Sequence, residues 1–198
     1  MNGYGKTASS NIDKKSSLPN HSWNAIEINN KWYLCDATWS SGFFNIDKNE
    51  FILEYNDGYF LAEPELFIKN HYPLDTKWIL LDDKISLSEF LNAPLIYKYA
   101  FNYQFIPLQP KTMKMEVAKN EEIIFLFEAS DSIQTHNIEL ELSSGSSKYP
   151  KKPIISRTKE GLLELKYTFE KLGYYDIHIK IDGQYLVTYT VRVRRNKK

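Results

Sequence analysis

Residues 20–39 read NHSWNAIEINNKWYLCDATW and decide how the first part of the chain folds. Two runs rich in β-forming residues flank Asn29 and Asn30, a pair that tolerates positive φ and therefore suits a tight primed turn. If Ile28 and Lys31 bracket that turn, the two runs pair as antiparallel strands. The stretch therefore predicts a β-hairpin.

The predicted hairpin places a histidine beside an acid. In this register His21 lies across from Thr38. Asp36 lies across from Trp23 and is a diagonal neighbour of His21 on one face, with Cβ atoms roughly 7–8 Å apart or somewhat less. An acid on one ring nitrogen fixes the histidine tautomer and leaves the other nitrogen to take a proton from a nucleophile. We therefore predict that His21 and Asp36 form a catalytic pair.

The nucleophile for such a pair is missing from the hairpin. Cys35 is the only cysteine of the chain, and strand alternation sends it to the face opposite His21 and Asp36. We interpret it as a small buried structural residue. Its neighbours on that face are Tyr33, Ile26 and Ile28. Several hydroxyls precede the hairpin, and we interpret them as turn-forming loop residues. They are Thr7, Ser9, Ser10, Ser16 and Ser17.

The pattern Asn-His-x-Trp-Asn, a short turn and then Trp-Tyr-x-x-Asp-Ala-Thr-Trp resembles the second half of a transglutaminase-like core domain, in its kyphoscoliosis-peptidase-like branch. Residues 67–81 and 86–90 continue the resemblance, which covers Met1 to about Ala100. That family is similar in fold to papain-type enzymes and uses a Cys-His-Asp triad. The resemblance implies that His21 and Asp36 match its histidine and aspartate, whereas no residue matches its cysteine.

Aromatic residues surround the predicted pair. Trp23 and Trp32 share the face of His21 and are expected to shield its imidazole from water. Trp39 and the aromatic residues between 43 and 60 are candidates for a substrate cleft. Aromatic density beside a sheet is more often core, however, and we favour the core interpretation. Asn24, on the other face, is interpreted as structural.

The remaining histidines suggest no metal or cofactor site. His71 lies near Asp75 and residues 82–83, but a metal site needs three or four ligands at regular spacing, and nothing completes the set. We predict a packed or surface histidine at this position, and no cofactor. His136 and His178 lie within strand-like runs and are predicted to have no partners.

Composition limits the class of partner. With 198 residues, 42% of them hydrophobic and 15% aromatic, the chain is expected to be globular. A formal net charge of zero lacks the basic surface expected of a protein that binds nucleic acid or anionic membranes, so peptides or proteins are the expected partners. The apolar runs fall short of the ~20 residues of a membrane span, and the start lacks a signal region, so the chain as given is expected to be soluble. A secreted or cell-surface location would need a leader upstream.

The sequence pattern changes in the second part of the chain, beyond residue 105. Pro107 and Pro110 indicate a linker, and short strand-like runs follow, separated by loop signals that include 143–147 and 150–153. The runs are 113–117, 123–128, 138–142, 162–169, 174–181 and 185–193. Their spacing predicts an immunoglobulin-like β-sandwich. The predicted fold is therefore α+β, with a transglutaminase-like half-domain over residues 1–104 and an all-β sandwich over 105–198.

Together these patterns predict a fragment or inactive form of a transglutaminase-like cysteine protease or acyltransferase acting on peptide or glutamine amides. The alternative is a non-catalytic, protein-binding or structural module that keeps the fold. An upstream coding segment with a cysteine in a Gly-x-Cys-x-Gly context would favour the enzyme. Without the helix that carries this cysteine, the face of Trp23, Trp32 and Leu34 would be bare, and a second copy of the chain is expected to cover it.

Overall fold

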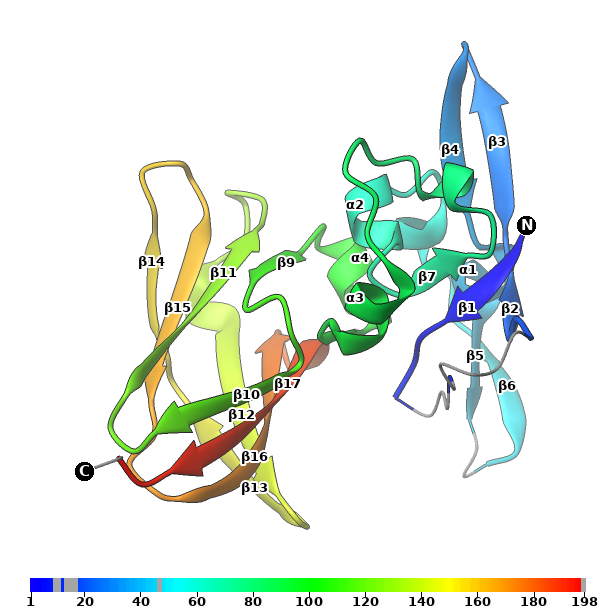
Figure 1. Cartoon of the computed structure of the whole chain (residues 1–198). Coiled ribbons are helices and arrows are strands. Elements are labelled where there is room, and N and C mark those ends of the chain that lie inside the picture. The colour runs from blue at the N-terminus through cyan, green and yellow to red at the C-terminus, as the bar shows by residue number, and fades with distance from the viewer. Residues whose placement is uncertain (9–11, 13–17, 46–47, 197–198) are drawn as a thin grey trace. The chain divides into compact units, whose positions relative to one another are not determined.

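The computed structural model describes residues 1–8, 12, 18–45 and 48–196, and most of its regular structure is β (Figure 1). By packing, the chain divides into two units, Met1–Leu91 and Asn92–Lys198. The boundary predicted after residue 104 falls within the second of these units. Within the described ranges, no helix is long and apolar enough to cross a membrane.

A three-stranded antiparallel sheet forms the centre of the first unit, with the strand order β2-β1-β7. Its strands are β1 (Asn2–Gly5), β2 (His21–Ser22) and β7 (His71–Pro73). In the middle strand, Gly3 pairs with His21 on one side, and Gly5 pairs with His71 on the other. The short strand expected near the start of the chain is therefore present, and it lies between two histidine-bearing strands.

The predicted hairpin consists of β3 (Asn24–Ile28) and β4 (Lys31–Cys35). Its strands pair in the predicted register, from Ile28 with Lys31 to Asn24 with Cys35. The turn residues Asn29 and Asn30 have φ values of 52° and 62°, as a primed turn requires. The hairpin prediction is confirmed.

The ladder of the hairpin ends earlier than predicted. The pairings of His21 with Thr38 and of Trp23 with Asp36 are wrong, because the chain leaves the hairpin on both sides of the Asn24–Cys35 pair. His21 pairs with β1 instead, and Asp36 begins a helix.

Short elements complete the first unit. They are α1 (Ala37–Ser41), β5 (Gly42–Asn45), β6 (Glu50–Leu53), the 3₁₀ turns η1 (Asp57–Tyr59) and η2 (Thr76–Ile79), α2 (Pro64–Phe67) and α3 (Leu87–Asn92). A capping box begins α3, since the Glu89 amide donates to Ser86 Oγ and the Ser86 amide donates to Glu89 Oε2. β5 and β6 pair as antiparallel strands, and Asn56 caps η1.

The core of the first unit gathers around Tyr4, Tyr72 and Phe90, with Ile68 and Ile79. The core interpretation of the aromatic residues between 43 and 60 holds for Tyr59 but is wrong for most of the others. β5 and β6 pair only with each other, so their side chains lack a neighbouring strand. The exposed aromatic residues are Phe43, Phe44, Phe51, Tyr55 and Phe60.

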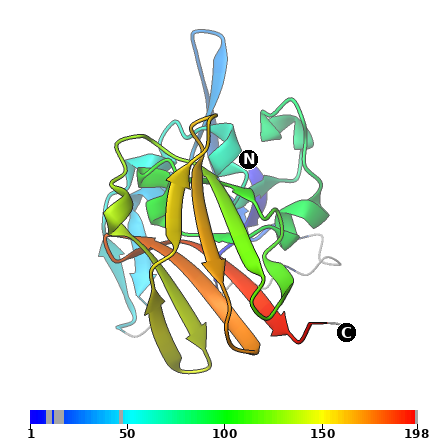
Figure 2. The same ribbon diagram turned by 90° about the vertical axis from the view of Figure 1, so that its left-hand side faces the viewer.

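The second unit is a sandwich of two sheets (Figure 1, Figure 2). One sheet has the order β14-β15-β11-β9. The other has the order β10-β17-β16-β12-β13, and β8 also pairs with β17. When strands A to G are taken as β9, β11, β12, β14, β15, β16 and β17, the first sheet reads D-E-B-A and the second holds G, F and C side by side, the arrangement of an immunoglobulin-like sandwich. The elements are β8 (Leu95–Ile96), α4 (Lys98–Asn102), β9 (Ile106–Gln109), β10 (Lys114–Ala118), β11 (Glu122–Glu128), the 3₁₀ turn η3 (Thr135–Asn137), β12 (Ile138–Ser144), β13 (Ser147–Lys151), β14 (Ile154–Arg157), β15 (Leu163–Thr168), β16 (Gly173–Ile181) and β17 (Gln184–Arg194).

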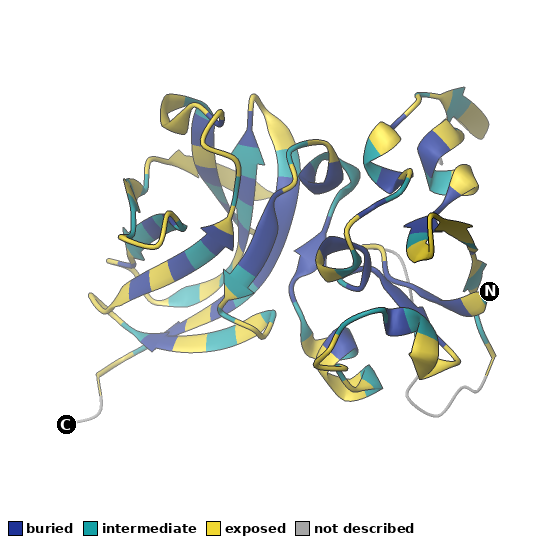
Figure 3. Cartoon of the chain, turned by 90° about the horizontal axis from the view of Figure 1, so that it is seen from above, coloured by how far each residue is buried: buried dark blue, intermediate teal, exposed yellow. Residues whose placement is uncertain are grey.

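Alternation along the strands builds the core of the sandwich. Figure 3 shows buried and more exposed residues alternating along strands. In β11 the buried residues are Ile123, Phe125 and Phe127, and the residues between them are exposed or half-buried. All six predicted runs are strands, namely β10, β11, β12, β15, β16 and β17.

Three further strands were predicted as linker or loop. β9 contains Pro107, β13 contains Pro150, and β14 directly follows Pro153. All three end their sheets, and an edge strand tolerates the missing N–H of proline. The prolines therefore mark sheet edges here, and their interpretation as linker or loop is wrong.

The histidines of the second unit also differ from expectation. His136 lies in η3 and not in a strand. His178 does have partners, since its Nε2 lies 2.9 Å from Ser143 Oγ and its Nδ1 lies 2.7 Å from Thr188 Oγ1. Both ring nitrogens are thus used within the sheet.

Candidate functional site

Asp36 is fixed in place because it caps a helix. It follows β4 and is the N-cap of α1, where its Oδ1 accepts a hydrogen bond from the Trp39 amide at 3.0 Å. Its own amide donates to the Tyr59 carbonyl at 2.9 Å. These bonds hold the residue and leave its second oxygen, Oδ2, for other donors.

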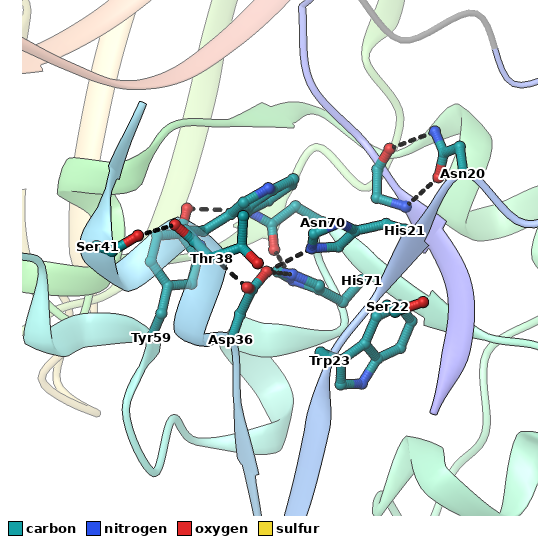
Figure 4. Close-up of polar contacts among 12 residues, drawn as sticks. Asn20, His21, Ser22, Trp23, Asp36, Thr38, Ser41, Tyr59, Asn70 and His71 are labelled. Carbon is teal, nitrogen blue, oxygen red and sulfur yellow. Dashed lines mark hydrogen bonds and ion pairs between the residues drawn. The ribbon is translucent and has the colours of Figure 1, made fainter. Parts of the chain in front are cut away.

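His21 reaches Asp36 from the central sheet. Its Nε2 lies 2.5 Å from Asp36 Oδ2 (Figure 4). The predicted contact between the two side chains is confirmed, although they come from different sheets. Because Nε2 faces the carboxylate, Nδ1 is the ring nitrogen available to another group.

A second histidine, His71, binds the same carboxylate oxygen. Its Nε2 lies 2.9 Å from Asp36 Oδ2, and its Nδ1 lies 2.6 Å from Asn70 Oδ1. Asn70 Nδ2 in turn donates to the Tyr59 hydroxyl at 3.4 Å. The sequence predicted a packed or surface histidine, and the buried position of His71 agrees with the first option. Its place in the site, and that of Asn70, went unrecognised.

Glycines in β1 make room for this arrangement. A Cβ on Gly5 would lie 3.0 Å from the Cβ of His21, and one on Gly3 would overlap the Trp23 ring and the Tyr72 carbonyl oxygen. Without side chains at Gly3 and Gly5, the imidazoles of His21 and His71 approach to 5.4 Å between ring centroids. The repeat of glycine at alternate positions was the one sequence signal for close approach here.

Aromatic rings enclose the two histidines. Trp39 stacks on His21 at 4.8 Å between centroids, and Phe67 stacks on His71 at 4.0 Å. Trp23, only 3% exposed, meets His71 edge-on at 5.1 Å. Trp23 therefore lies at the site, where it was predicted, and Trp39, predicted as a core residue or part of a cleft, joins it there.

Trp32 does not join them, and its predicted shielding role is wrong. It is 40% exposed and packs edge-on against Trp78 at 4.9 Å. Although it was predicted on the face of Asp36, it lies four residues further along the strand, roughly 13 Å at the usual rise per residue. At the site, Phe67 packs against His71 and Trp23 in place of Trp32.

Electrostatics favour an ionised Asp36. Burial raises the pKa of this carboxyl, but the hydrogen bonds with His21 and His71 and the Trp39 amide outweigh burial and hold the pKa well below its usual range. For His71, burial lowers the pKa to about 4, against the opposing pull of Asp36. We therefore describe His71 as neutral at pH 7, beside a charged carboxylate.

The same three side chains carry atoms that could bind a metal ion, all within 4.8 Å of one another. Both imidazole contacts with Asp36 have the length of hydrogen bonds. Ligands around a tetrahedral zinc at about 2.0–2.2 Å would stand further from one another, at roughly 3.3 Å or more. The arrangement is therefore that of a hydrogen-bonded network.

Cys35 is buried and its thiol is engaged elsewhere. Its Sγ accepts a hydrogen bond from the Leu61 amide at 3.3 Å, so the structural interpretation is confirmed. Its expected neighbours Ile26 and Ile28 are exposed instead, at 38% and 40%. A cavity of about 430 Å³ borders the Cys35 side of the hairpin, with mostly apolar walls. Its lining includes Asn24, Tyr55, Tyr59 and Phe60.

Among the hydroxyl residues, Thr7 is exposed. Ser9, Ser10, Ser16 and Ser17 lie outside the described residues. The interpretation of these hydroxyls as turn-forming loop residues therefore stays a prediction.

The hairpin face predicted to be bare is largely covered within the chain. Trp23 and Leu34 are 3% and 2% exposed, and Trp23 packs against Phe67 and His71. The prediction of an uncovered face is wrong for both residues, because α2 and β7 supply the cover. A homodimer stays a prediction, now without this support.

Comparison with known proteins supports a transglutaminase-like relationship for about half of the chain. Kyphoscoliosis peptidase of Mus musculus is 33% identical over 104 residues, which are 52% of this chain and 16% of that protein. Hillarin of Drosophila melanogaster is 31% identical over 115 residues, covering 52% and 14%. The Lim and transglutaminase domain protein ltd-1 of Caenorhabditis elegans is 27% identical over 92 residues, covering 42% and 13%.

These matches span only about a sixth of the length of the curated relatives. No family model matches the chain. Among solved structures, the Lin-41 filamin domain is similar with a TM-score of 0.37 and 14% identity, over 48% of this chain and 95% of that one.

Proposed function

We propose that this chain carries the histidine and aspartate of a transglutaminase-like, cysteine-dependent acyl-transfer site, in a fragment or inactive form of such an enzyme. The observation that carries the proposal is the contact of His21 Nε2 with the buried Asp36 Oδ2 at 2.5 Å. On this proposal, the first unit is the second half of a papain-like core. The substrate class is a peptide amide or the carboxamide of glutamine.

On this proposal, each ring nitrogen of His21 has its own role. Nε2 of His21 donates to Asp36, which holds the ring and stabilises an imidazolium. Nδ1 takes the proton of the attacking thiol and later gives it to the leaving amine. Trp39 stacked on the ring, with Trp23 beside it, excludes water and strengthens the pairing with Asp36.

The thiol comes from outside residues 1–198 on this proposal. Cys35 is the only cysteine. Its side chain lies on the opposite face of β4, where its Sγ accepts a hydrogen bond from the Leu61 amide. A histidine and its acid without a nucleophile keep only weak residual catalysis. The chain by itself is therefore expected to be inactive.

The test compares two polypeptides. Chain 1–198 should show no amide hydrolysis and no glutamine-to-amine transfer above buffer. A polypeptide that extends upstream through the coding region to a cysteine segment should turn over, and His21→Ala should reduce its kcat at least 10²-fold. His136→Ala is the matched control, since this residue lies in η3 of the second unit. Turnover that survives His21→Ala in the extended polypeptide would refute the proposal.

The binding-module alternative is favoured by one observation, the engagement of the sole cysteine away from His21. On that reading, the His21–Asp36 pair is kept only because it holds the fold together. A coding region that starts at Met1, with no cysteine segment before it, would favour this alternative.

A further inference from the structure

We propose that His71 is a positioning residue of this site, a neutral imidazole that donates from Nε2 to Asp36 and competes with His21 for the same oxygen. The role goes beyond the proposed acyl transfer. It concerns only the proton network, so it holds whether or not a cysteine joins the site.

The geometry concentrates both histidines on one atom. Asp36 Oδ2 lies 2.5 Å from His21 Nε2 and 2.9 Å from His71 Nε2, while Oδ1 is used by the Trp39 amide. The side chains of Asp36 and His71 are both fully buried, at 0% exposure. The negative charge is therefore balanced by these three donors without competition from bulk water, and a change in one donor must be felt by the others.

The surroundings of His71 disfavour a positive charge on its ring. Among the described residues, the titratable groups that face it are Asp36 at the start of α1, His21 from β2 and Tyr59 from η1. Its Nδ1 meets the side-chain amide of Asn70, and aromatic rings enclose the imidazole, with Phe67 stacked on it at 4.0 Å. An imidazolium at this fully buried position would be desolvated and would repel any charge on the His21 ring, whose centroid lies 5.4 Å away.

Neutrality also fixes the tautomer of His71. A neutral imidazole has one N–H, and the carboxylate at Nε2 is the strongest acceptor in reach, so the proton lies on Nε2. Nδ1 must then accept, and its neighbour 2.6 Å away is the side-chain amide of Asn70. A half-turn of that amide presents its NH₂ group to Nδ1 and its oxygen to the Tyr59 hydroxyl. The orientation of Asn70 therefore follows the charge of His71.

Loss of the second donor should strengthen the hydrogen bond between His21 and Asp36 Oδ2. The Trp39 amide still holds the carboxylate, but Oδ2 would then have His21 as its only partner. A carboxylate oxygen with fewer donors accepts more strongly from the donor that remains. His71→Phe removes the donor while keeping an aromatic ring to stack on Phe67, and His71→Gln can keep an N–H donor.

The experiment is an NMR titration of the four histidines in the full chain, with ¹⁵N shifts of the ring nitrogens to identify the tautomers. In the unmodified chain, His71 should carry its proton on Nε2 and should not titrate between pH 5 and 9. His71→Phe should move the ¹H resonance of the His21 Nε2–H downfield, because its hydrogen bond with Asp36 Oδ2 is no longer shared with a second donor. His71→Gln should return this resonance toward its position in the unmodified chain. His136→Gln is the control and should change nothing at His21.

Two results would overturn the proposal. One is a folded His71→Phe variant in which the His21 Nε2–H resonance is unchanged. The other is a His71 ring in the unmodified chain that is protonated on both nitrogens at pH 7, or on Nδ1 alone. The tautomer measurement needs no substitution, so it decides the question even if His71→Phe does not fold. Neither measurement uses a thiol, so failure here is distinct from failure of the proposed acyl transfer.

Discussion

Replacement of Asp36 by asparagine removes the charge at the centre of the network and little else. Asparagine has nearly the same shape and caps helices as well as aspartate does, so its oxygen can still accept from the Trp39 amide. Its NH₂ group would then face the two imidazoles. A matched control exists in Asp75, which caps η2 by accepting from the Lys77 amide at 3.1 Å but lies at the surface.

The size of the loss follows from the contacts of Oδ2. Both imidazoles can avoid the new NH₂ group by moving their protons to Nδ1, where Asn70 Oδ1 can accept from His71. Both charge-assisted hydrogen bonds to the carboxylate are then replaced by neutral ones, and a hydrogen bond to a charged group contributes roughly 1.5–3 kcal/mol against about 1 kcal/mol for a neutral bond. We expect Asp36→Asn to lower the free energy of unfolding by about 2–4 kcal/mol. Asp75→Asn should leave it almost unchanged, because the cap is kept and the site is exposed.

The assay is urea denaturation at pH 7 followed by tryptophan fluorescence. All four tryptophans, Trp23, Trp32, Trp39 and Trp78, belong to the first unit, so the signal reports this unit alone. Trp23 and Trp39 touch the imidazoles directly. Equal losses in Asp36→Asn and Asp75→Asn would refute the reasoning, since Asp36 would then act only as a cap.

Two further predictions concern the same unit. The pKa of His71 is lowered from 6.5 to about 4 on folding, so between these values the unfolded chain binds more protons, and acidification from pH 6.5 to 4 should lower the free energy of unfolding by roughly 3 kcal/mol. Asp36, with its pKa depressed on folding, contributes stability that is lost only below about pH 4. In His71→Gln, the free energy of unfolding from urea titrations should therefore be nearly constant between about pH 4 and 6.5. The same dependence on pH as in the parent chain would contradict the assignment to His71. Gly3→Ala should cost about 1–3 kcal/mol, because the new Cβ overlaps the Trp23 ring and the Tyr72 carbonyl, and a thermal midpoint equal to that of the parent chain would show that β1 does not pack on Trp23.

The sequence predicted those parts of the site that depend on local pairing. Asn29 and Asn30 fix the turn, and alternation then fixes the register from Ile28–Lys31 to Asn24–Cys35. That register was enough to bring the regions of His21 and Asp36 together. It failed beyond Asn24, where the helix cap at Asp36 and pairing with β1 replaced the ladder.

His71 could not be found in this way. Its place beside Asp36 depends on the sheet order β2-β1-β7, which joins segments 50 residues apart in the chain, His21 and His71, across Gly3 and Gly5. No local periodicity encodes that order. Metal ligands are recognised in a sequence by their spacing along the chain. The partner of His71 is instead the carboxylate of Asp36, which folding brings close.

In the sandwich, by contrast, local sequence pattern was sufficient to predict most of the strands. Its strands alternate clearly, so six of them were predicted from pattern alone, as in β11 and β16. The missed strands have proline in or beside them, at Pro107, Pro150 and Pro153. Proline breaks the local pattern of a strand, and only the position of that strand at a sheet edge explains why it is tolerated.

The central claim is that His21 is a base held by Asp36, and the tautomer of His21 in the Asp36→Asn variant tests it most directly. A carboxylate at Nε2 holds the proton of the neutral ring on that nitrogen, whereas the NH₂ group of an asparagine would move the proton to Nδ1. The ¹⁵N shifts of the neutral ring should therefore report the Nε2–H tautomer in the parent chain and in Asp75→Asn, and the Nδ1–H tautomer in Asp36→Asn. The same tautomer in Asp36→Asn and in the parent chain would mean that the two side chains do not act as a pair.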